Sequence, residues 1–123
     1  MPSAGSNFTQ LERAVLEAIC ERCAEDRAAL EAQLSTASIV SRENTGAGFY
    51  AHFAVKRIPG AAIGGERLKN GPAVRIDGLE HGMGFILWLE NGYMNLLEGY
   101  SYDESTRGFD FERIGFEIRA DQP

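Results

Sequence analysis

Seven ionisable side chains near the ends of predicted strands could do acid–base or metal chemistry. The chain has only two histidines, His52 and His81. An imidazole with one or two carboxylates within hydrogen-bonding reach could form an acid–base pair or hold a divalent metal. Such a site needs convergence of Arg42, Glu43, His52, Glu80, His81, Glu98 and Tyr100.

The alternative role for these residues is structural. The sequence has no H-x-x-x-H, H-E-x-x-H or paired-carboxylate motif. In this interpretation His81 fixes a tight turn and His52 is a surface residue of a strand. Arg42 would form ion pairs with Glu43 or Glu80, or would bind an anionic ligand through two parallel hydrogen bonds. We expect no cofactor and no metal, and we name His52 and His81 as ligands if a metal binds.

The two cysteines, Cys20 and Cys23, form a C-x-x-C pair inside a predicted helix. A redox site of this type lies at a helix N-terminus, where the thiol pKa is lowered. Zinc needs two further ligands, and the sequence has no second pair. We therefore expect structural or incidental thiols. The acidic residues around the cysteines would raise the pKa of both thiols: Glu17, Glu21, Glu25 and Asp26.

Nucleophilic serine chemistry is not indicated either, because the sequence has no G-x-S-x-G motif.

A β-hairpin at residues 83–102 is the strongest structural signal. Its turn is Asn-Gly at 91–92, which suits the positive φ angles of a two-residue turn between two apolar runs. Such a turn fixes the pairing of the strands. The predicted register places these residues on the core: Met83, Phe85, Leu87, Leu89, Met94, Leu96 and Tyr100.

The same register sets two glycines and one carboxylate in unusual places. Glu98 falls opposite Phe85 on the apolar face, and Gly84 falls opposite Gly99. A bulge near Gly99 would move Glu98 to the other face, and we favour this explanation. The alternative is a functional carboxylate beside a glycine-lined gap.

The second face of the hairpin is too apolar for simple exposure to solvent. More chain, a second subunit or a partner protein should cover it. The candidate interface residues are Ile86, Trp88, Tyr93 and Leu97.

Two helices are predicted before the strands. A capping box, with Thr9 at the N-cap and Glu12 at N3, starts a helix over 10–23. Acidic residues at 25–26 suggest a break, and Leu30 begins the apolar edge of a second, shorter helix. A single long helix is the alternative.

Strands are predicted at 37–42, 48–57, 73–79, in the hairpin and near 109–118. The glycine-rich segment 58–72 is predicted to be a mobile loop that could serve as a lid over a site. This order predicts the α+β class, with an N-terminal helix or helix pair packed on one face of a five- to six-stranded, mainly antiparallel sheet. We expect a disordered N-terminus at 1–8 and a single domain at 9–120.

Composition excludes several function classes. The net charge of −6 over 123 residues disfavours binding to nucleic acid through phosphates. The chain has no apolar run long enough to span a membrane and no signal-peptide pattern at its start. We therefore expect a cytoplasmic protein that binds neither membranes nor nucleic acid.

Three short stretches resemble a known group of proteins. They are Ser-Arg-Glu at 41–43, Leu-x-His-Gly at 79–82 and Glu-Gly-Tyr at 98–100. With the helical N-terminus, they make residues 10–105 similar to a family of small bacterial proteins of unassigned function. The resemblance implies a bacterial, intracellular protein and brings no activity, cofactor or catalytic residue with it.

The leading functional prediction is a binding or interaction protein rather than an enzyme. The second face of the hairpin would be its contact surface, in a homodimer or against another protein. One version is an immunity-type antidote whose acidic surface blocks a basic toxin. The alternative is a small ligand- or metal-binding enzyme, with its polar site at the sheet end under the loop 58–72.

Overall fold

Two helices precede the strands, and the α+β prediction is confirmed. The computed structural model describes residues 7–65 and 67–119. These residues form seven strands rather than the predicted five or six, because the three-residue strand at 68–70 was not foreseen. The elements are α1 (Gln10–Arg22), a 3-10 turn (Ala24–Asp26), α2 (Arg27–Leu34), β1 (Ser38–Asn44), β2 (Gly48–Ala54), β3 (Leu68–Asn70), β4 (Val74–Ile76), β5 (Met83–Glu90), β6 (Tyr93–Ser101) and β7 (Phe116–Ile118).

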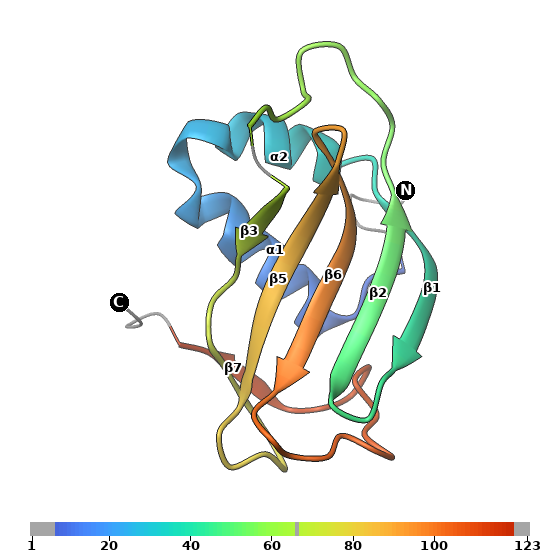
Figure 1. Cartoon of the computed structure of the whole chain (residues 1–123), viewed down its shortest axis with the longest axis vertical. Coiled ribbons are helices and arrows are strands. Elements are labelled where there is room, and N and C mark those ends of the chain that lie inside the picture. The colour runs from blue at the N-terminus through green and yellow to red at the C-terminus, as the bar shows by residue number, and fades with distance from the viewer. Residues whose placement is uncertain (1–6, 66, 120–123) are drawn as a thin grey trace.

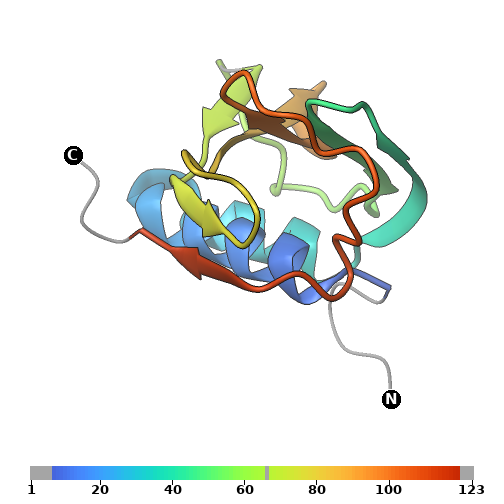
Figure 2. The same cartoon turned by 90° about the horizontal axis from the view of Figure 1, so that it is seen from below.

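The strands form one antiparallel sheet in the order β1-β2-β6-β5-β4-β7, and β3 also pairs with β5 (Figure 1). Both helices lie against the same face of the sheet. The sheet curves so that β4 and β7 come down beside α1 (Figure 2). Helix α1 contacts β5 and β7, and α2 contacts β6. We call the face turned away from the helices the outer face.

Helix α1 begins at the predicted capping box. The Glu12 amide donates to Thr9 Oγ1 at 3.0 Å, and the Thr9 amide donates to Glu12 Oε1 at 2.9 Å. The helix ends at Arg22 and a 3-10 turn follows, which confirms two helices rather than one. The apolar stripe of α1 is buried, and each large side chain in it contributes roughly 1.5–3 kcal/mol. Its members are Leu11, Val15, Leu16, Ile19 and Cys20.

The hairpin has its predicted turn but not its predicted register. Asn91 and Gly92 have φ angles of 55° and 87°, as a two-residue turn requires. Beyond the turn, Trp88 pairs with Leu96, so Asn95 is an extra residue in β6 and forms a bulge. The bulge that we expected near Gly99 lies here instead. From this point every residue of β6 is shifted by one position relative to the prediction.

The shift exchanges core and surface residues of β6. Leu97, predicted at the interface, is 0% exposed and lies in the core. Leu96 and Tyr100, predicted in the core, lie on the outer face and are partly exposed. Glu98 moves to the outer face, as the bulge explanation required, and pairs with Ile86.

The predicted glycine-lined gap is absent from the hairpin. Gly84 pairs with Tyr100 rather than with Gly99. A Cβ atom on Gly84 would lie 2.4 Å from the phenol of Tyr100, so the glycine makes room for this ring. Gly99 pairs with Phe85, and a Cβ there would lie 2.8 Å from Phe85 Cε2. Aromatic side chains therefore occupy the space that the prediction left open.

The described part of the segment 58–72 is tied to the hairpin at several points, which argues against the predicted mobile lid. The Ile63 amide donates to Gly92 O at 2.9 Å, and the Gly71 amide donates to Phe85 O at 2.8 Å. Between them, β3 pairs with β5. Ala61 and Ile63 are buried. These contacts hold the segment against the side of the sheet.

The predicted N-terminal end of the domain needs adjustment. Residues 1–6 of the predicted disordered N-terminus lie outside the described residues, as does position 120 at the other end. Phe8 lies inside the fold, because its ring packs edge-to-face on Phe53 with centroids 5.3 Å apart. The predicted final strand is reduced to β7, and Phe111 in the preceding turns packs on Phe49 at 4.7 Å.

Candidate functional site

The seven predicted polar residues lie in three separate places. Arg42 and Glu43 lie on β1, which is one edge of the sheet, and Glu43 faces outward in the same row as Tyr50 and Glu98. Glu80 and His81 lie in the turn before β5, at the opposite end of that strand from the segment 58–65. On the outer face lie His52, Glu98 and Tyr100. The predicted pocket under the loop therefore does not contain Glu80 or His81.

Arg42 is held by Glu12 rather than by Glu43 or Glu80. Arg42 Nε and Nη2 donate to the two Glu12 carboxylate oxygens at 2.8 Å each, and Nη2 also donates to the Asn7 carbonyl. Hydrogen bonding to Glu12 raises the pKa of Arg42. The Glu12 side chain is 2% exposed. The structural ion pair that we weighed for Arg42 is therefore present, with an unforeseen partner.

A hollow of about 210 Å³ lies beside this ion pair. Its apolar wall comes from Phe49, Phe109 and Phe111. The guanidinium of Arg42 already makes three hydrogen bonds there, so it is not available for two-pronged binding of an anionic ligand. The hollow therefore gives little support to the ligand-binding alternative.

The turn that carries His81 is organised by a carboxylate from a distant loop. The backbone amides of Glu80 and His81 donate to Glu104 at 2.8 and 3.0 Å. These two hydrogen bonds lower the pKa of Glu104. Because the amides bind Glu104, this turn is a structural junction between two loops.

The lowered pKa of Glu104 predicts that this residue stabilises the fold in a pH-dependent way. Its folded pKa lies below the ordinary value of 4.5, so its stabilisation is present above that value and is lost as pH falls through the folded pKa. We expect Glu104→Gln to unfold at lower urea than wild type near neutral pH, with the difference disappearing in acid. Urea titrations from about pH 7 to about pH 3 measure this. Asp103→Asn is the control, and a difference independent of pH contradicts the prediction.

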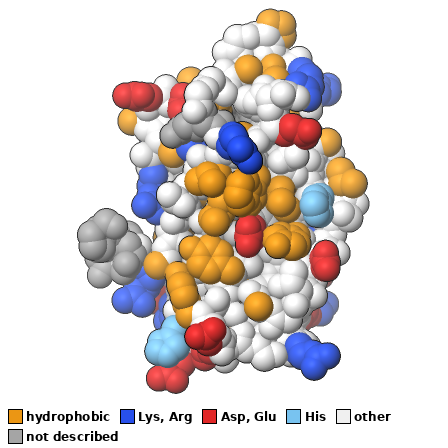
Figure 3. All heavy atoms as spheres, in the orientation of Figure 1, with side chains coloured by type: hydrophobic (Ala, Val, Ile, Leu, Met, Phe, Trp, Pro, Cys, Tyr) orange, Lys and Arg blue, Asp and Glu red, His pale blue; other side chains and the backbone are white. Residues whose placement is uncertain are grey.

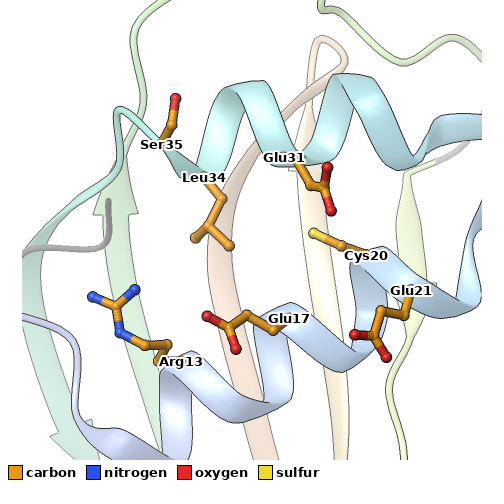
Figure 4. Close-up of a pocket in the computed structure, with 7 residues that line it drawn as sticks. All are labelled: Arg13, Glu17, Cys20, Glu21, Glu31, Leu34 and Ser35. Atoms are coloured by element: carbon orange, nitrogen blue, oxygen red, sulfur yellow. The ribbon is translucent and has the colours of Figure 1, made fainter. Parts of the chain in front are cut away.

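Cys20 lines a groove between α1 and α2. This hollow of about 300 Å³ is lined by the side chains drawn in Figure 4, where Cys20 and Glu31 point toward each other across it. Burial, and then the Glu31 charge, raises the pKa of Cys20 to about 11. Both cysteines are free thiols. In the described part of the chain, no group of three or more His, Cys, Asp or Glu side chains is arranged to hold a metal ion.

Cys20 is expected to resist alkylation while the protein is folded. With a pKa of about 11 instead of 9.0, the thiolate fraction near pH 8 falls by about 100-fold. In a Cys23→Ser variant, we expect iodoacetamide to modify Cys20 at least about 100-fold more slowly in buffer than in urea. Mass spectrometry gives both rates. Rates within about tenfold of each other would contradict the buried, protonated thiol.

The outer face carries a patch of apolar side chains at its middle. The strand register aligns Leu68, Trp88 and Leu96 in one row across the sheet. The next row holds Ile86, Glu98 and Tyr50. Figure 3 shows hydrophobic side chains gathered over the middle of this face, with an acidic side chain among them. We define the outer-face patch as the partly exposed residues Tyr50, Leu68, Ile86, Trp88, Leu96, Glu98 and Tyr100.

A single hydrogen bond fixes the polar centre of the patch. Trp88 Nε1 donates to Glu98 Oε1 at 3.0 Å. Within residues 7–65 and 67–119, Glu98 Oε2 makes no hydrogen bond or ion pair. Glu98 is thus a carboxylate with one oxygen held by an indole and the other open to the outside.

The predicted interface residues are divided by the structure. Ile86 and Trp88 lie on the outer face and are partly exposed. Tyr93 donates its hydroxyl to Ile58 O at 3.2 Å, and the Arg57 guanidinium lies 4.8 Å from its ring centroid. Tyr93 therefore holds neighbouring chain in place at the edge of this face. The prediction for Leu97 is wrong, because the bulge turns it into the core.

Three patch residues were predicted neither as interface residues nor as members of the polar site. Tyr50 could have been included, because the alternation of 48–57 already placed it on the face away from the core. Leu96 was missed because the predicted register, which lacked the bulge at Asn95, placed it in the core. Leu68 was missed because its three-residue strand lies in the glycine-rich segment that was predicted to be a loop.

Comparison with known proteins yields no relative. No protein-family model matches the chain. No curated protein and no solved structure matches it either. The described residues contain no helix that is long and apolar enough to cross a membrane. The fold itself therefore gives the class: an α+β protein with helices on one face of its sheet and an open, partly apolar outer face.

Proposed function

We propose that this chain is a small cytoplasmic protein-binding module whose contact surface is the outer-face patch. The observation that carries the proposal is the position of Trp88. It lies among apolar neighbours on the face opposite both helices, and it is only partly buried. Contiguous exposed apolar surface of this kind marks interaction sites, and Trp and Tyr are the residues that most often anchor them.

The competing enzyme hypothesis has weaker support. An acid–base pair needs contact of roughly 2.6–3.2 Å or one bridging water. His81 lies in the turn before β5, whereas His52 pairs with Leu96 in the middle of the sheet. Their separation favours binding over catalysis. The net charge of −6 adds a preference for basic partners, as an immunity-type protein would need.

Site-specific photo-crosslinking tests the proposal. A benzoylphenylalanine at Leu96, in the patch, is expected to capture a partner in the native cells on illumination. The matched control position is Ala28, which is exposed on α2. Capture of a second copy would give an adduct of twice 13.5 kDa, and a different mass would give another protein. Adducts at Leu96 no stronger than those at Ala28 would refute the proposal.

A further inference from the structure

We infer that the partner of the outer-face patch presents a lysine or arginine flanked by apolar residues, and that it is not a second copy of this chain. This inference rests on the proposed function and adds the chemistry of the partner. Glu98 carries it, because of where the bulge places this side chain.

Glu98 lies at the middle of the outer-face patch. Its neighbours across the sheet are Ile86 on β5 and Tyr50 on β2. Along β6, the residues two positions away on the same face are Leu96 and Tyr100. A partner that covers the apolar neighbours must also cover the carboxylate.

Covering a carboxylate is unfavourable unless the partner supplies an opposite charge or hydrogen-bond donors. The Trp88 indole satisfies Glu98 Oε1, and Oε2 has no partner in the described chain. A lysine ammonium or an arginine guanidinium would donate a charge-assisted hydrogen bond to Oε2. The partner therefore needs a cation at the centre of an otherwise apolar contact.

The aromatic side chains of the patch favour the same group. Tyr50 pairs with Glu98 across the sheet, and the indole of Trp88 is hydrogen-bonded to Glu98. Cations are attracted to the faces of such rings. The edge of the same face already holds one example, since Arg57 lies over Tyr93 at 4.8 Å. A cation at Glu98 would meet a carboxylate and aromatic faces together.

The position of Glu98 argues against self-association through this face. A two-fold axis through the middle of the patch would place the two Glu98 carboxylates against each other. Two like charges in a site shielded from water repel strongly. Each chain also carries a net charge of −6, which opposes the encounter.

The first test is the oligomeric state of the protein. Sedimentation of the wild-type chain is expected to show no dimer that depends on the patch. A dimer that dissociates on Trp88→Ala substitution would overturn the inference about the partner, although it would support the proposed interface. A monomer, or a dimer that persists in Trp88→Ala, supports the inference.

The second test selects partners by chemistry. A phage-displayed library of random peptides is selected on the wild-type protein. We expect enriched peptides to combine a lysine or arginine with apolar residues. Their dissociation constants should rise at least about tenfold on Glu98→Gln, because this change removes the charge but keeps an acceptor for Trp88.

The matched control for this test is Glu43→Gln. Glu43 lies in the same row at the edge of the sheet, beside Tyr50. Its substitution makes the same change in net charge and is expected to weaken binding by less than about threefold. Enriched peptides without a basic residue, equal effects of the two substitutions or no enrichment at all would each overturn the inference. Crosslinking at Leu96 to a partner would leave the proposed function standing in those cases.

Discussion

Replacement of Arg42 by methionine is expected to lower the free energy of unfolding by about 3 kcal/mol. The substitution leaves the Glu12 carboxylate, 2% exposed, without its two hydrogen bonds from the guanidinium. Breaking a buried ion pair from one side costs about 3–5 kcal/mol, and we take the lower end because the Arg42 side chain is 32% exposed. Urea unfolding followed by the single tryptophan, Trp88, measures the change.

An exposed ion pair provides the matched control. Arg27 donates to Glu31 at 2.9 Å, and both side chains are 52% exposed. Arg27→Met is expected to cost less than about 0.5 kcal/mol, as exposed helix pairs do. A Glu12→Gln/Arg42→Met double variant should be more stable than Arg42→Met alone, because no uncompensated charge stays buried. Equal losses in Arg42→Met and Arg27→Met would contradict this role of the buried pair.

The Glu12–Arg42 pair shows what local sequence can predict and what it cannot. The capping box lies within four residues, so its chemistry is readable from the sequence and correctly predicts the start of α1. The second role of Glu12 depends on a residue 30 positions away. No local pattern indicates which strand residue will reach a helix terminus. Arg42 was therefore recognised as an ion-pair candidate, but its partner was not.

In the hairpin too, local sequence predicts one part of the structure, and packing against the rest of the molecule decides the other. The Asn-Gly turn fixes the first two pairs of the ladder through backbone φ angles, and both are as predicted. The bulge at Asn95 depends on which of Leu96 and Leu97 fits the core, which is a property of the packed molecule. Strand β2 has no bulge against β6, so its alternation correctly places Tyr50 and His52 on the outer face. The one-residue shift in β6 is what puts Glu98 and Leu96 beside them.

Short strands were missed or predicted too long. Strand β3 has three residues, which is too few for a period of two to be recognised, and β7 keeps only three residues of the strand predicted near 109–118. The glycines around β3 also suggested a free loop. Backbone hydrogen bonds and one buried side chain, Gln33 on α2, hold this segment instead.

Replacement of Gln33 by leucine is expected to lower the free energy of unfolding by about 3 kcal/mol, although leucine is the better core residue. Gln33 is 0% exposed. Its Nε2 donates to Ala61 O at 2.6 Å and to Gly92 O at 2.9 Å, and its Oε1 accepts from the Met94 amide at 2.8 Å. Gly92 O still accepts from Ile63 in the variant, but two buried backbone groups lose this side-chain partner, at about 1–3 kcal/mol each.

The matched control is the same substitution on an exposed helical position. Gln10→Leu, on α1, is expected to change the free energy of unfolding by less than about 0.5 kcal/mol. Hydrogen exchange adds a local measurement, since the Met94 amide should lose protection in Gln33→Leu. A loss below about 1 kcal/mol with unchanged exchange at Met94 would mean that the polar clamp contributes little. The segment 58–72 would then be held only by its backbone contacts to the hairpin, and the prediction of a mobile loop would regain support.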